Sequence, residues 1–386
     1  MNLPVKVTHL VYSWLPVTQN WIWSQLHFNE SADSSVICMT EENCGLFPVA
    51  KKFTAFSTRT ADKAGLLMAR YWIRQPAAFL RRSLSASGPD IVHGHFSTES
   101  WRVLSHAKAA GLPLVTTFYG LDVDKLPRRR VWKKRYRDLF SYGARFMVEG
   151  PFMGKRLEAI GCPAEKIRVV ALGVDRSLYR HNLHEGEKDR TTVRVLFTGL
   201  SREKKGPLDA AAAFIIAAGR APALELHCIG DGPYRPKMER MLHAAGLSDR
   251  VVFHGFVPVE KYRTLLSESD IVLAPSRYAA DGDCEGGAPV VCIEAQASGV
   301  PVAGTRHCDI PFVVIHGRTG LLSPEGDRES IARDMVILAG DRNLRRSMGA
   351  RGRDHAAKQH DITLQVQKIT GVYREALLQG NRRMQP

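Results

Sequence analysis

The sequence predicts an α/β protein made of two doubly wound domains. Short apolar runs rich in β-branched residues alternate with longer stretches of helical periodicity, and this alternation is typical of parallel sheets covered by helices. The chain has 386 residues, whereas a single hydrophobic core usually stops growing at about 250–300 residues. The segment Arg180–Thr192 has Leu183 as its one large apolar residue, so it is predicted to link two domains. We therefore expect an N-terminal domain over residues 1–185, a second domain over 186–362, and a C-terminal helix and tail over 363–386.

The strands of the first domain are expected where short apolar runs are rich in β-branched residues. These runs are Val5–Tyr12, Ser35–Met39, Ile91–His95, Leu114–Phe118 and Arg145–Val148. In the second domain, strands are expected at Val193–Thr198, Leu224–Ile229, Val251–Phe253, Ile271–Ala274 and Val300–Ala303. Helices are expected between them at Leu208–Ala218, Tyr234–Ala245, Lys261–Ser267 and Val290–Ser298. The last amphipathic stretch, from Thr363 to Leu378, can pack on either domain.

Composition excludes several classes of protein. Hydrophobic residues make up 44% of the chain and charged residues 24%, which is typical of a globular protein rather than of a disordered chain, a collagen or a coiled coil. The longest unbroken apolar run, Ala210–Ala218, has nine residues, while a membrane-spanning helix needs about 20. No signal peptide is recognised, so the protein is expected in the cytoplasm. The seven scattered cysteines form no CxxC pair and are predicted to be reduced packing residues.

The net charge points to an anionic partner. The chain carries 54 basic and 39 acidic residues, a net charge of +15. Such an excess favours nucleic acid, a phospholipid surface or a phosphorylated substrate, and charge alone does not choose among them.

Two open α/β sheets in tandem are expected to bind ligands where the carboxyl ends of their strands meet a common cleft. The predicted strand Val193–Thr198 is followed by a turn that carries Arg202, Lys204 and Lys205 around Glu203. Cations beside a helix N-terminus can bind a diphosphate, because free backbone N–H groups and the helix dipole add to the side-chain charge. A solvated charged turn is the alternative interpretation of this segment alone.

A second candidate is the carboxylate of Glu294, which lies in an otherwise small and apolar helical run after the loop Gly286-Gly287. Burying a carboxylate costs several kcal/mol unless a partner offsets it. Sugar hydroxyls are suitable partners, because a carboxylate can accept two hydrogen bonds from them.

The order of these and other motifs resembles the retaining glycosyltransferases of family four, which have the two-Rossmann GT-B fold. The motifs are Arg202-x-Lys204-Lys205-Gly206, Ile229-Gly230-Asp231-Gly232-Pro233, His254-Gly255-Phe256-Val257, the segment from Glu285 to Val302, and His316-Gly317-x-Thr319-Gly320. The N-terminal half is similar more loosely, through Asp90-Ile91-Val92-His93-Gly94-His95-Phe96 and the segment from Leu114 to Val123. Among family members, the chain looks most like transferases of exopolysaccharide and colanic-acid-type assembly.

The resemblance implies a role for particular residues. Lys205 would bind the nucleotide diphosphate, and Arg202 is the candidate for the family's arginine, whose usual position is Leu200 here. Glu294 would take the ribose hydroxyls and Glu285 the donor sugar. These glutamates are nine positions apart rather than the family's usual eight, because Gly286-Gly287 is doubled. The other expected nucleotide-sugar positions are Gly286, Gly287, Ala288, Pro289, Gly230, Gly255 and Phe256.

Tyr119 stands where the family has a histidine that points at the donor sugar. A tyrosine keeps a hydrogen-bonding tip but is not the same acid or base near pH 7. His95, at the end of the preceding strand, is expected to cover part of that role, whereas His93 is interpreted as a core residue.

The implied reaction is transfer from a nucleotide-diphosphate sugar to a glycan or lipid-linked acceptor, with retention by front-face displacement. Both glutamates are assigned to hydroxyl binding, which leaves no carboxylate as nucleophile. The leaving diphosphate would be stabilised by Lys205, Arg202 and the amides of Gly286-Gly287 at a helix start. No metal or other cofactor is expected, since no His or Asp cluster at ligand spacing is found. A non-catalytic relative that binds a nucleotide sugar or a partner protein, and an epimerase on the same fold, are the alternatives.

The segment from Lys125 to Arg137 holds eight cations and no acid, interleaved with Leu126, Val131, Trp132 and Tyr136. A basic amphipathic stretch with aromatic residues indicates binding to anionic lipid, and places the protein at the inner face of the cell membrane. Nucleic acid is a competing partner without a recognisable binding module, so it is not expected. A merely solvated helix is the other alternative.

Overall fold

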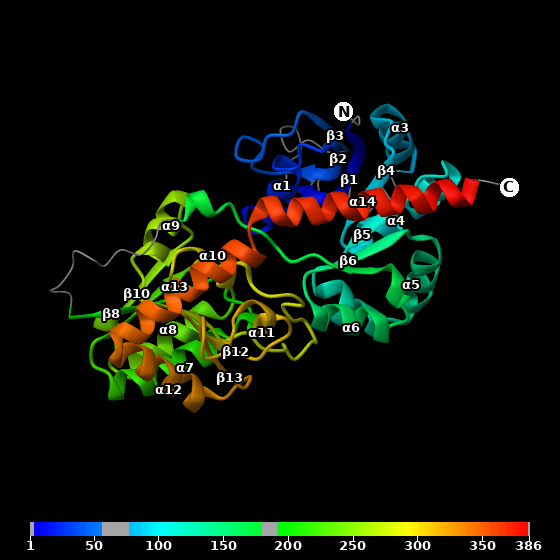
Figure 1. Cartoon of the computed structure of the whole chain (residues 1–386). Helices are drawn as coiled ribbons and strands as arrows, with labels where there is room; N and C mark the ends of the chain where they lie inside the picture. The colour runs from blue at the N-terminus through cyan, green and yellow to red at the C-terminus, as the bar shows by residue number, and fades with distance from the viewer. Residues whose placement is uncertain (1–3, 56–76, 180–190, 385–386) are drawn as a thin grey trace. The chain divides into compact units, whose positions relative to one another are not determined.

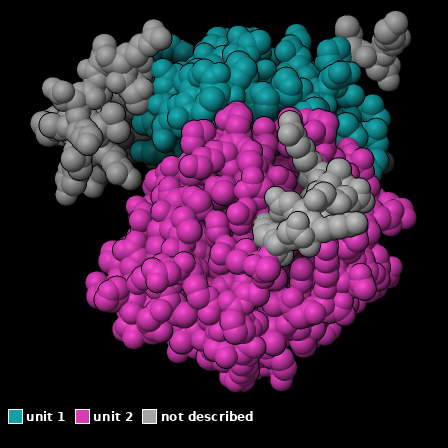
Figure 2. All heavy atoms as spheres, turned by 90° about the vertical axis from the view of Figure 1, so that its left-hand side faces the viewer, with its two compact units in different colours: residues 1–148, 154–173, 362–386 teal, residues 149–153, 174–361 magenta. Residues whose placement is uncertain are grey.

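The computed structural model describes residues 4–55, 77–179 and 191–384. The chain forms two compact units, coloured teal and magenta in Figure 2. Unit 1 comprises residues 1–148, 154–173 and 362–386, and unit 2 comprises residues 149–153 and 174–361. The chain enters unit 2 for the second time at Val174, earlier than the predicted boundary at residue 185. Most of the predicted linker, residues 180–190, lies outside the described residues.

The sheet of unit 1 is parallel, with the order β3-β2-β1-β4-β5-β6-β7. Its strands are β1 (Val5–Trp14), β2 (Ala32–Glu41), β3 (Lys51–Thr54), β4 (Ile91–His95), β5 (Leu114–Thr117), β6 (Arg145–Val148) and β7 (Ile167–Val169). The edge strands β3 and β7 were not predicted. Both are short and half-exposed, so neither carries the continuous apolar run that marks the buried strands.

The helices of unit 1 are α1 (Asn20–His27), α3 (Ala77–Ser87), α4 (Ser97–Ala109), α5 (Arg130–Tyr142) and α14 (Ile362–Met384), while α6 (Pro151–Ala159) begins in unit 2. Helix α14, red in Figure 1, lies against β4, β5 and β6. Its residues Ile369, Val372 and Tyr373 share a core cluster with Val7 and Ile91. The last amphipathic stretch of the sequence therefore completes the core of unit 1.

The sheet of unit 2 is also parallel, with the order β10-β9-β8-β11-β12-β13. Its strands are β8 (Val193–Thr198), β9 (Leu224–Ile229), β10 (Val251–Gly255), β11 (Ile271–Ala274), β12 (Val302–Thr305) and β13 (Gly320–Ser323). Strand β12 begins after Pro301 rather than at the predicted Val300, since a proline has no N–H for the ladder. The predicted α/β class with two doubly wound sheets is confirmed.

The helices of unit 2 are α7 (Pro207–Arg220), α8 (Arg235–Ala244), α9 (Val259–Ser267), α10 (Val290–Ala297), α11 (Ile310–Val313), α12 (Arg328–Gly340) and α13 (Arg342–Gln359). The core lies where α7 and α12 pack on the sheet, and Ala210, Ala213 and Phe214 are fully buried there. Strand order reverses between β8 and β11. A reversal of this kind opens a crevice beside the carboxyl ends of the two strands, which is where α/β sheets bind ligands.

Candidate functional site

The loops that follow β8, β9 and β10 form one edge of the candidate site in unit 2. The backbone N–H of Gly199 donates to the Ile229 carbonyl at 3.0 Å, and that of Gly230 donates to the Gly255 carbonyl at 2.7 Å. Gly230 has φ of +103°, and a Cβ there would lie 2.2 Å from the Gly199 oxygen. Only glycine fits that approach. Phe256, also predicted to bind the nucleotide, is 70% exposed.

Lys205 and Glu285 form an ion pair at the reversal of strand order. Lys205 ends a short 3-10 turn, Glu203–Lys205, after β8, and its Nζ lies 2.9 Å from the Glu285 Oε2. Ser276, just after β11, donates to the Glu285 Oε1 at 3.2 Å. Burial by itself would raise the pKa of Glu285, but the positive charges of Lys205 and Lys204 outweigh it and hold the pKa below its ordinary value. The pair is therefore charged at neutral pH.

Lys204 and Arg202 are the other two cations of the turn that was predicted to bind a diphosphate, and their surroundings differ. Lys204 lies 3.4 Å from the Asp283 Oδ1 and donates to the Cys284 carbonyl at 3.0 Å. Arg202 is exposed on the surface. The structure thus brings Lys205 and Lys204 to the loop that holds Glu285, and it leaves the Arg202 side chain in solvent.

The predicted helix start at Val290 is confirmed, but the Gly286-Gly287 amides, which were expected at that start, are not the first N–H groups of the helix. Helix α10 begins at Val290, so both glycine amides precede it by a turn that also contains Ala288 and Pro289. All four residues are buried. The reason for a glycine at 287 is steric, because a Cβ there would lie 1.7 Å from the Glu149 Oε2.

Glu294 in α10 is buried, with 6% of its surface exposed. The phenol of Tyr179 donates to its Oε1 at 2.6 Å, and the phenol of Tyr262 donates to its Oε2. Burial raises the pKa of Glu294, and the two phenols counteract that rise. The partners of the predicted hydroxyl-binding carboxylate are therefore protein hydroxyls, and each carboxylate oxygen retains a second lone-pair site for a ligand.

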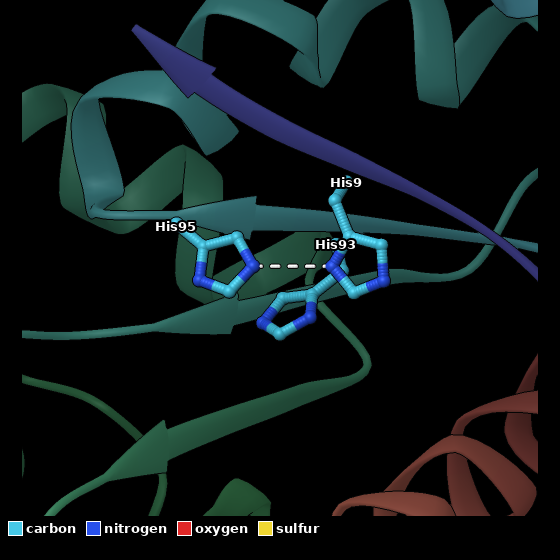
Figure 3. Close-up of side chains that lie close together, drawn as sticks. All are labelled: His9, His93 and His95. Atoms are coloured by element: carbon cyan, nitrogen blue, oxygen red, sulfur yellow. Dashed lines mark hydrogen bonds between the residues drawn. The ribbon is translucent and has the colours of Figure 1, made fainter. Parts of the chain in front are cut away.

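A histidine cluster occupies the end of β4 in unit 1 (Figure 3). The structure brings the predicted pair together, since His95 Nδ1 lies 2.8 Å from the Tyr119 hydroxyl. The other nitrogen of His95, Nε2, lies 3.1 Å from the Nδ1 of His9 on the neighbouring strand β1, as Figure 3 shows. His93 lies beneath them and is bonded to the hydroxyls of Tyr373 and Thr117, each at 2.8 Å. The interpretation of His93 as a core residue is confirmed.

These histidines are uncharged at neutral pH. His93 and His95 are fully buried and His9 is 3% exposed. Burial lowers the pKa of His9 to about 3, and it lowers the pKa values of His93 and His95 well below the ordinary 6.5. His95 can accept and donate hydrogen bonds to position Tyr119, but it cannot supply a proton as an imidazolium near pH 7.

The fold brings together two groups of possible metal ligands that show no ligand spacing in the sequence, and the expectation that no metal is needed stays a prediction. Among the described residues, His9, His93 and His95 form one, and Cys284, His307 and Cys308 form another. Parts of each cluster come from loops or strands far apart in the chain, so a search for ligand spacing along the sequence misses both.

The basic segment places its aromatic residues in the core rather than on the surface. Leu126, Trp132 and Tyr136 are buried, and the Arg135 guanidinium stacks on Trp132 at 4.9 Å from the ring centroid. This corrects the prediction that the aromatic residues contribute to a lipid-binding face. The exposed cations are Arg128, Arg129, Arg130, Lys133, Lys134 and Arg137. No helix within the described ranges has a stretch long and apolar enough to span a membrane.

Comparison with known proteins assigns the chain to a family. The model for glycosyl transferases group 1 matches residues 181–355, and the model for glycosyltransferase family 4 matches residues 47–178. N-acetyl-alpha-D-glucosaminyl L-malate synthase of Bacillus anthracis is 32% identical over an alignment that covers 96% of this chain and 89% of that protein. The chain belongs to the family-4 glycosyltransferases. The group 1 match contains Lys205, Glu285 and Glu294, while the family 4 match contains His95 and Tyr119.

Further similar proteins are found among curated sequences and solved structures. The amylovoran biosynthesis glycosyltransferase AmsK of Erwinia amylovora is 34% identical over 64% of this chain, and the match spans 60% of AmsK. Among solved structures, HepE of Anabaena in complex with UDP and glucose has a TM-score of 0.76 at 16% identity, with 96% of this chain and 99% of that one covered. Sucrose-phosphate synthase from Thermosynechococcus elongatus has a TM-score of 0.73 at 16% identity, covering 96% and 99%. These likenesses show the GT-B fold.

Sequence reasoning missed several residues of this family-4 site. Ser276 follows a predicted strand directly, so the rule of polar residues at strand ends was sufficient to find it. Tyr179 and Tyr262 have no local signal, because each meets Glu294 only through the packing of separate segments. His307, which accepts from the Glu285 backbone N–H at 3.2 Å, is another residue of this kind.

Proposed function

We propose that the protein transfers a sugar, with retention, from a nucleoside-diphosphate sugar to a glycan or lipid-linked saccharide in cell-surface polysaccharide synthesis. The observation that carries this proposal is the Lys205–Glu285 pair at 2.9 Å, with the buried Glu294 in the helix that follows the same loop. One similar protein, AmsK, is named for amylovoran biosynthesis, and the HepE structure contains UDP and glucose. The first fact supports a role in polysaccharide synthesis here, and the second supports a nucleotide sugar as donor.

Lys205 is the cation that binds the leaving diphosphate. Its ammonium group is held by Glu285, and 23% of the Lys205 side chain is exposed. A diphosphate carries more charge than a carboxylate, so it competes for Lys205 and frees one Glu285 oxygen for a donor-sugar hydroxyl. Ser276 keeps the other Glu285 oxygen in place. Charge that grows on the leaving phosphate as the glycosidic bond breaks strengthens its attraction to Lys205 in the transition state.

Glu294 binds the ribose hydroxyls of the donor. Its two oxygens already accept from Tyr179 and Tyr262, which fix the orientation of the carboxylate. Both remaining lone-pair sites can then accept from the two vicinal hydroxyls of a ribose.

The hydrogen bonds and the ion pair of the two carboxylates support front-face displacement. Glu285 is bonded to Lys205 and Ser276, and Glu294 to two phenols. Neither is placed as a free nucleophile for double displacement. The ammonium groups of Lys205 and Lys204 supply the positive charge that the diphosphate needs, so the reaction is proposed to need no metal ion. The Tyr119 hydroxyl, held by His95, takes the hydrogen-bonding part that the family gives to a histidine.

We further propose that the protein works at the inner face of the cell membrane and attaches there mainly by charge. The exposed cations of the segment 125–137 attract acidic headgroups, while its aromatic residues stay in the core. Nucleic acid is not a proposed partner.

A donor screen tests the proposed activity. Purified protein is incubated with a panel of nucleoside-diphosphate sugars and an acceptor extract, and release of the nucleoside diphosphate is measured together with the anomeric configuration of the product by NMR. Turnover with retention is expected, and the Lys205→Ala variant should abolish it. An inverted product contradicts the mechanism. Tight donor binding without any turnover favours the non-catalytic alternative.

A further inference from the structure

Cys308, His307 and Glu325 in unit 2 are arranged as a nucleophile, a base and an orienting carboxylate. The Sγ of Cys308 lies 3.2 Å from the His307 Nε2, and the His307 Nδ1 lies 2.7 Å from the Glu325 Oε1. A thiol within hydrogen-bond reach of an imidazole that a third group orients is the geometry of an activated nucleophile. The proposed glycosyl transfer gives Cys308 and Glu325 no role, and it uses His307 only through its contact with the Glu285 backbone N–H.

A second thiol lies beside the first. The sulfur of Cys284, the sulfur of Cys308 and a ring nitrogen of His307 lie within 4.8 Å of one another. Both cysteines are reduced and buried, with Cys284 fully enclosed and Cys308 at 9% exposure. Two sulfurs this close are within reach of a disulfide after side-chain rotation, whereas the sulfur of an isolated buried cysteine has no such partner.

We propose that Cys308 is a peroxide-sensitive thiol and that Cys284 is its resolving cysteine, so that oxidation closes a Cys284–Cys308 disulfide. The chemistry of this modification site does not rest on the proposed transferase function.

The hydrogen bonding around Cys308 supports the proposal. The His307 Nδ1 is held by Glu325, which turns the His307 Nε2 toward the Sγ of Cys308 at 3.2 Å. His307 is therefore placed to take the thiol proton, and the thiolate that this leaves is the form that reacts with peroxide. Cys292, in the same unit, has its pKa raised to about 12 by burial.

The reaction balances with hydrogen peroxide as the oxidant. The Cys308 thiolate attacks one peroxide oxygen, the O–O bond breaks, and hydroxide leaves, so that Cys308 becomes a sulfenic acid. The Cys284 sulfur then attacks the sulfenic sulfur, the S–S bond forms, and the sulfenic oxygen leaves as water with the Cys284 proton. Two thiols are oxidised by two electrons and one peroxide is reduced. A thiol reductant reverses the change.

The disulfide would act on the donor site through one peptide bond. Cys284 immediately precedes Glu285, whose backbone N–H donates to the His307 Nε2 at 3.2 Å. Drawing the two sulfurs together displaces this loop and with it the carboxylate that holds Lys205. Given the proposed function, oxidation then lowers activity reversibly.

Peptide mapping of the full-length protein tests the proposal directly. The protein is treated with hydrogen peroxide, free thiols are blocked with N-ethylmaleimide, and peptides are identified by mass spectrometry without reduction. We expect a peptide pair joined through Cys284 and Cys308, which dithiothreitol separates. With Cys284→Ser, dimedone should label Cys308 as a persistent sulfenic acid. The matched control Cys292→Ser should form the disulfide as the wild type does.

Three outcomes would overturn the proposal. One is oxidation of Cys292 or Cys228 at a peroxide dose that leaves Cys308 unchanged. Another is His307→Gln forming the disulfide as fast as the wild type, since loss of the base should slow it by about 10-fold or more. The last is one equivalent of zinc in the purified protein that Cys308→Ser loses, which would make the cluster a metal site. A disulfide that forms without loss of transfer activity contradicts only the coupling to Glu285.

Discussion

The phenol of Tyr179 donates a hydrogen bond of 2.6 Å to Oε1 of Glu294, a residue that lies 115 positions further along the chain. Tyr262 does the same for Oε2. The buried carboxylate thus already has hydroxyl donors around it before any ligand arrives, which keeps it oriented and offsets part of its desolvation. A ribose would add to this arrangement rather than create it.

Removal of either phenol should therefore weaken donor binding in a pH-dependent way. Tyr179→Phe or Tyr262→Phe removes a hydrogen bond to a charged group, which corresponds to about a 10-fold rise in KM for the donor. Burial raises the pKa of Glu294 and the phenols lower it, so each variant should have a still higher pKa. The ionised carboxylate is the form that binds the donor. As the pH falls, each variant should therefore lose affinity for the donor at a higher pH than the wild type does. KM measured against pH checks this.

Tyr142→Phe is the matched control for the loss of a phenol. The Tyr142 hydroxyl donates to the carbonyls of Ala107 and Leu112 in unit 1. The Tyr142→Phe substitution should leave the dependence of KM on pH unchanged. Superimposable profiles for all three variants would remove the assigned role of Glu294.

Lys205→Ala and Glu294→Gln should each lower kcat/KM by at least about 100-fold, because each removes a charged contact made at the donor. Lys205→Ala also leaves the Glu285 carboxylate buried without its partner, which should cost about 3 kcal/mol of unfolding free energy. The double variant Lys205→Ala/Glu285→Gln should regain much of that stability but no activity. Denaturant unfolding and initial rates separate the two effects.

Lys358→Ala, which removes an exposed lysine paired with Asp354, is the control and should behave as wild type. Near-normal turnover in either donor-site variant would refute the assignment of these residues.

Activity should survive a chelator. The ammonium groups of Lys205 and Lys204 provide the charge-assisted contacts to the diphosphate that a metal ion would otherwise make. We expect equal rates with and without EDTA in protein dialysed against it. Loss of activity on chelation, with recovery on addition of magnesium or manganese, would contradict the proposed mechanism.

Mild acid should destabilise unit 1. The histidine cluster is neutral when folded, since burial holds the pKa of His9 at about 3 instead of the ordinary 6.5. Below about pH 6.5 an unfolded chain binds protons at these histidines, whereas the folded chain does not. The free energy of unfolding should therefore fall as the pH drops from 6.5 toward 3. Each histidine contributes up to about 1.4 kcal/mol per pH unit.

Tryptophan fluorescence reports this effect selectively, because all six tryptophans lie within residues 1–148 of unit 1. Urea unfolding at pH 7.5 and pH 5.5 should show a lower midpoint at the acid pH. His9→Gln should have a shallower dependence on pH. Equal slopes for wild type and variant would show that other groups cause the acid sensitivity.

The basic segment should bind acidic vesicles mainly through charge. Neutralising Arg129, Arg130 and Lys134 with glutamine removes about 1 kcal/mol of attraction for each residue, which weakens binding on the order of 100-fold. Arg135 is kept, because it stacks on Trp132. Binding of the wild type should also fall steeply with added salt.

The control carries the same change of charge elsewhere: Arg342, Arg346 and Lys358, all exposed on α13, are replaced by glutamine. Flotation of this control should match the wild type, and donor affinity should be unchanged in both variants. Equal losses in the two triple variants would mean that net charge, rather than this segment, governs vesicle binding.

The sequence by itself determined the α/β class, the central strands and the family, and it marked Lys205, Glu285 and Glu294 as candidate site residues. These features are local: a buried strand shows as a run of apolar residues, and a motif depends on neighbours in the chain. The short edge strands β3 and β7 escaped because they bury little apolar surface. Chain spacing also suggested that Gly286-Gly287 begins a helix, whereas the close approach of Glu149 is what requires a glycine there.

Only the tertiary structure decided which groups meet. It paired Glu294 with Tyr179 and Tyr262, joined His9 to His95, and set Cys284 beside Cys308. It also turned Trp132 and Tyr136 into the core, which leaves the cations of the basic segment and Val131 on its surface. Partners of this kind come from separate strands and loops that the packing of a sheet and its helices brings together. No pattern along the sequence predicts which of these residues come into contact. The free energy that stabilises the contacts comes from burial of the whole core and not from the residues that touch.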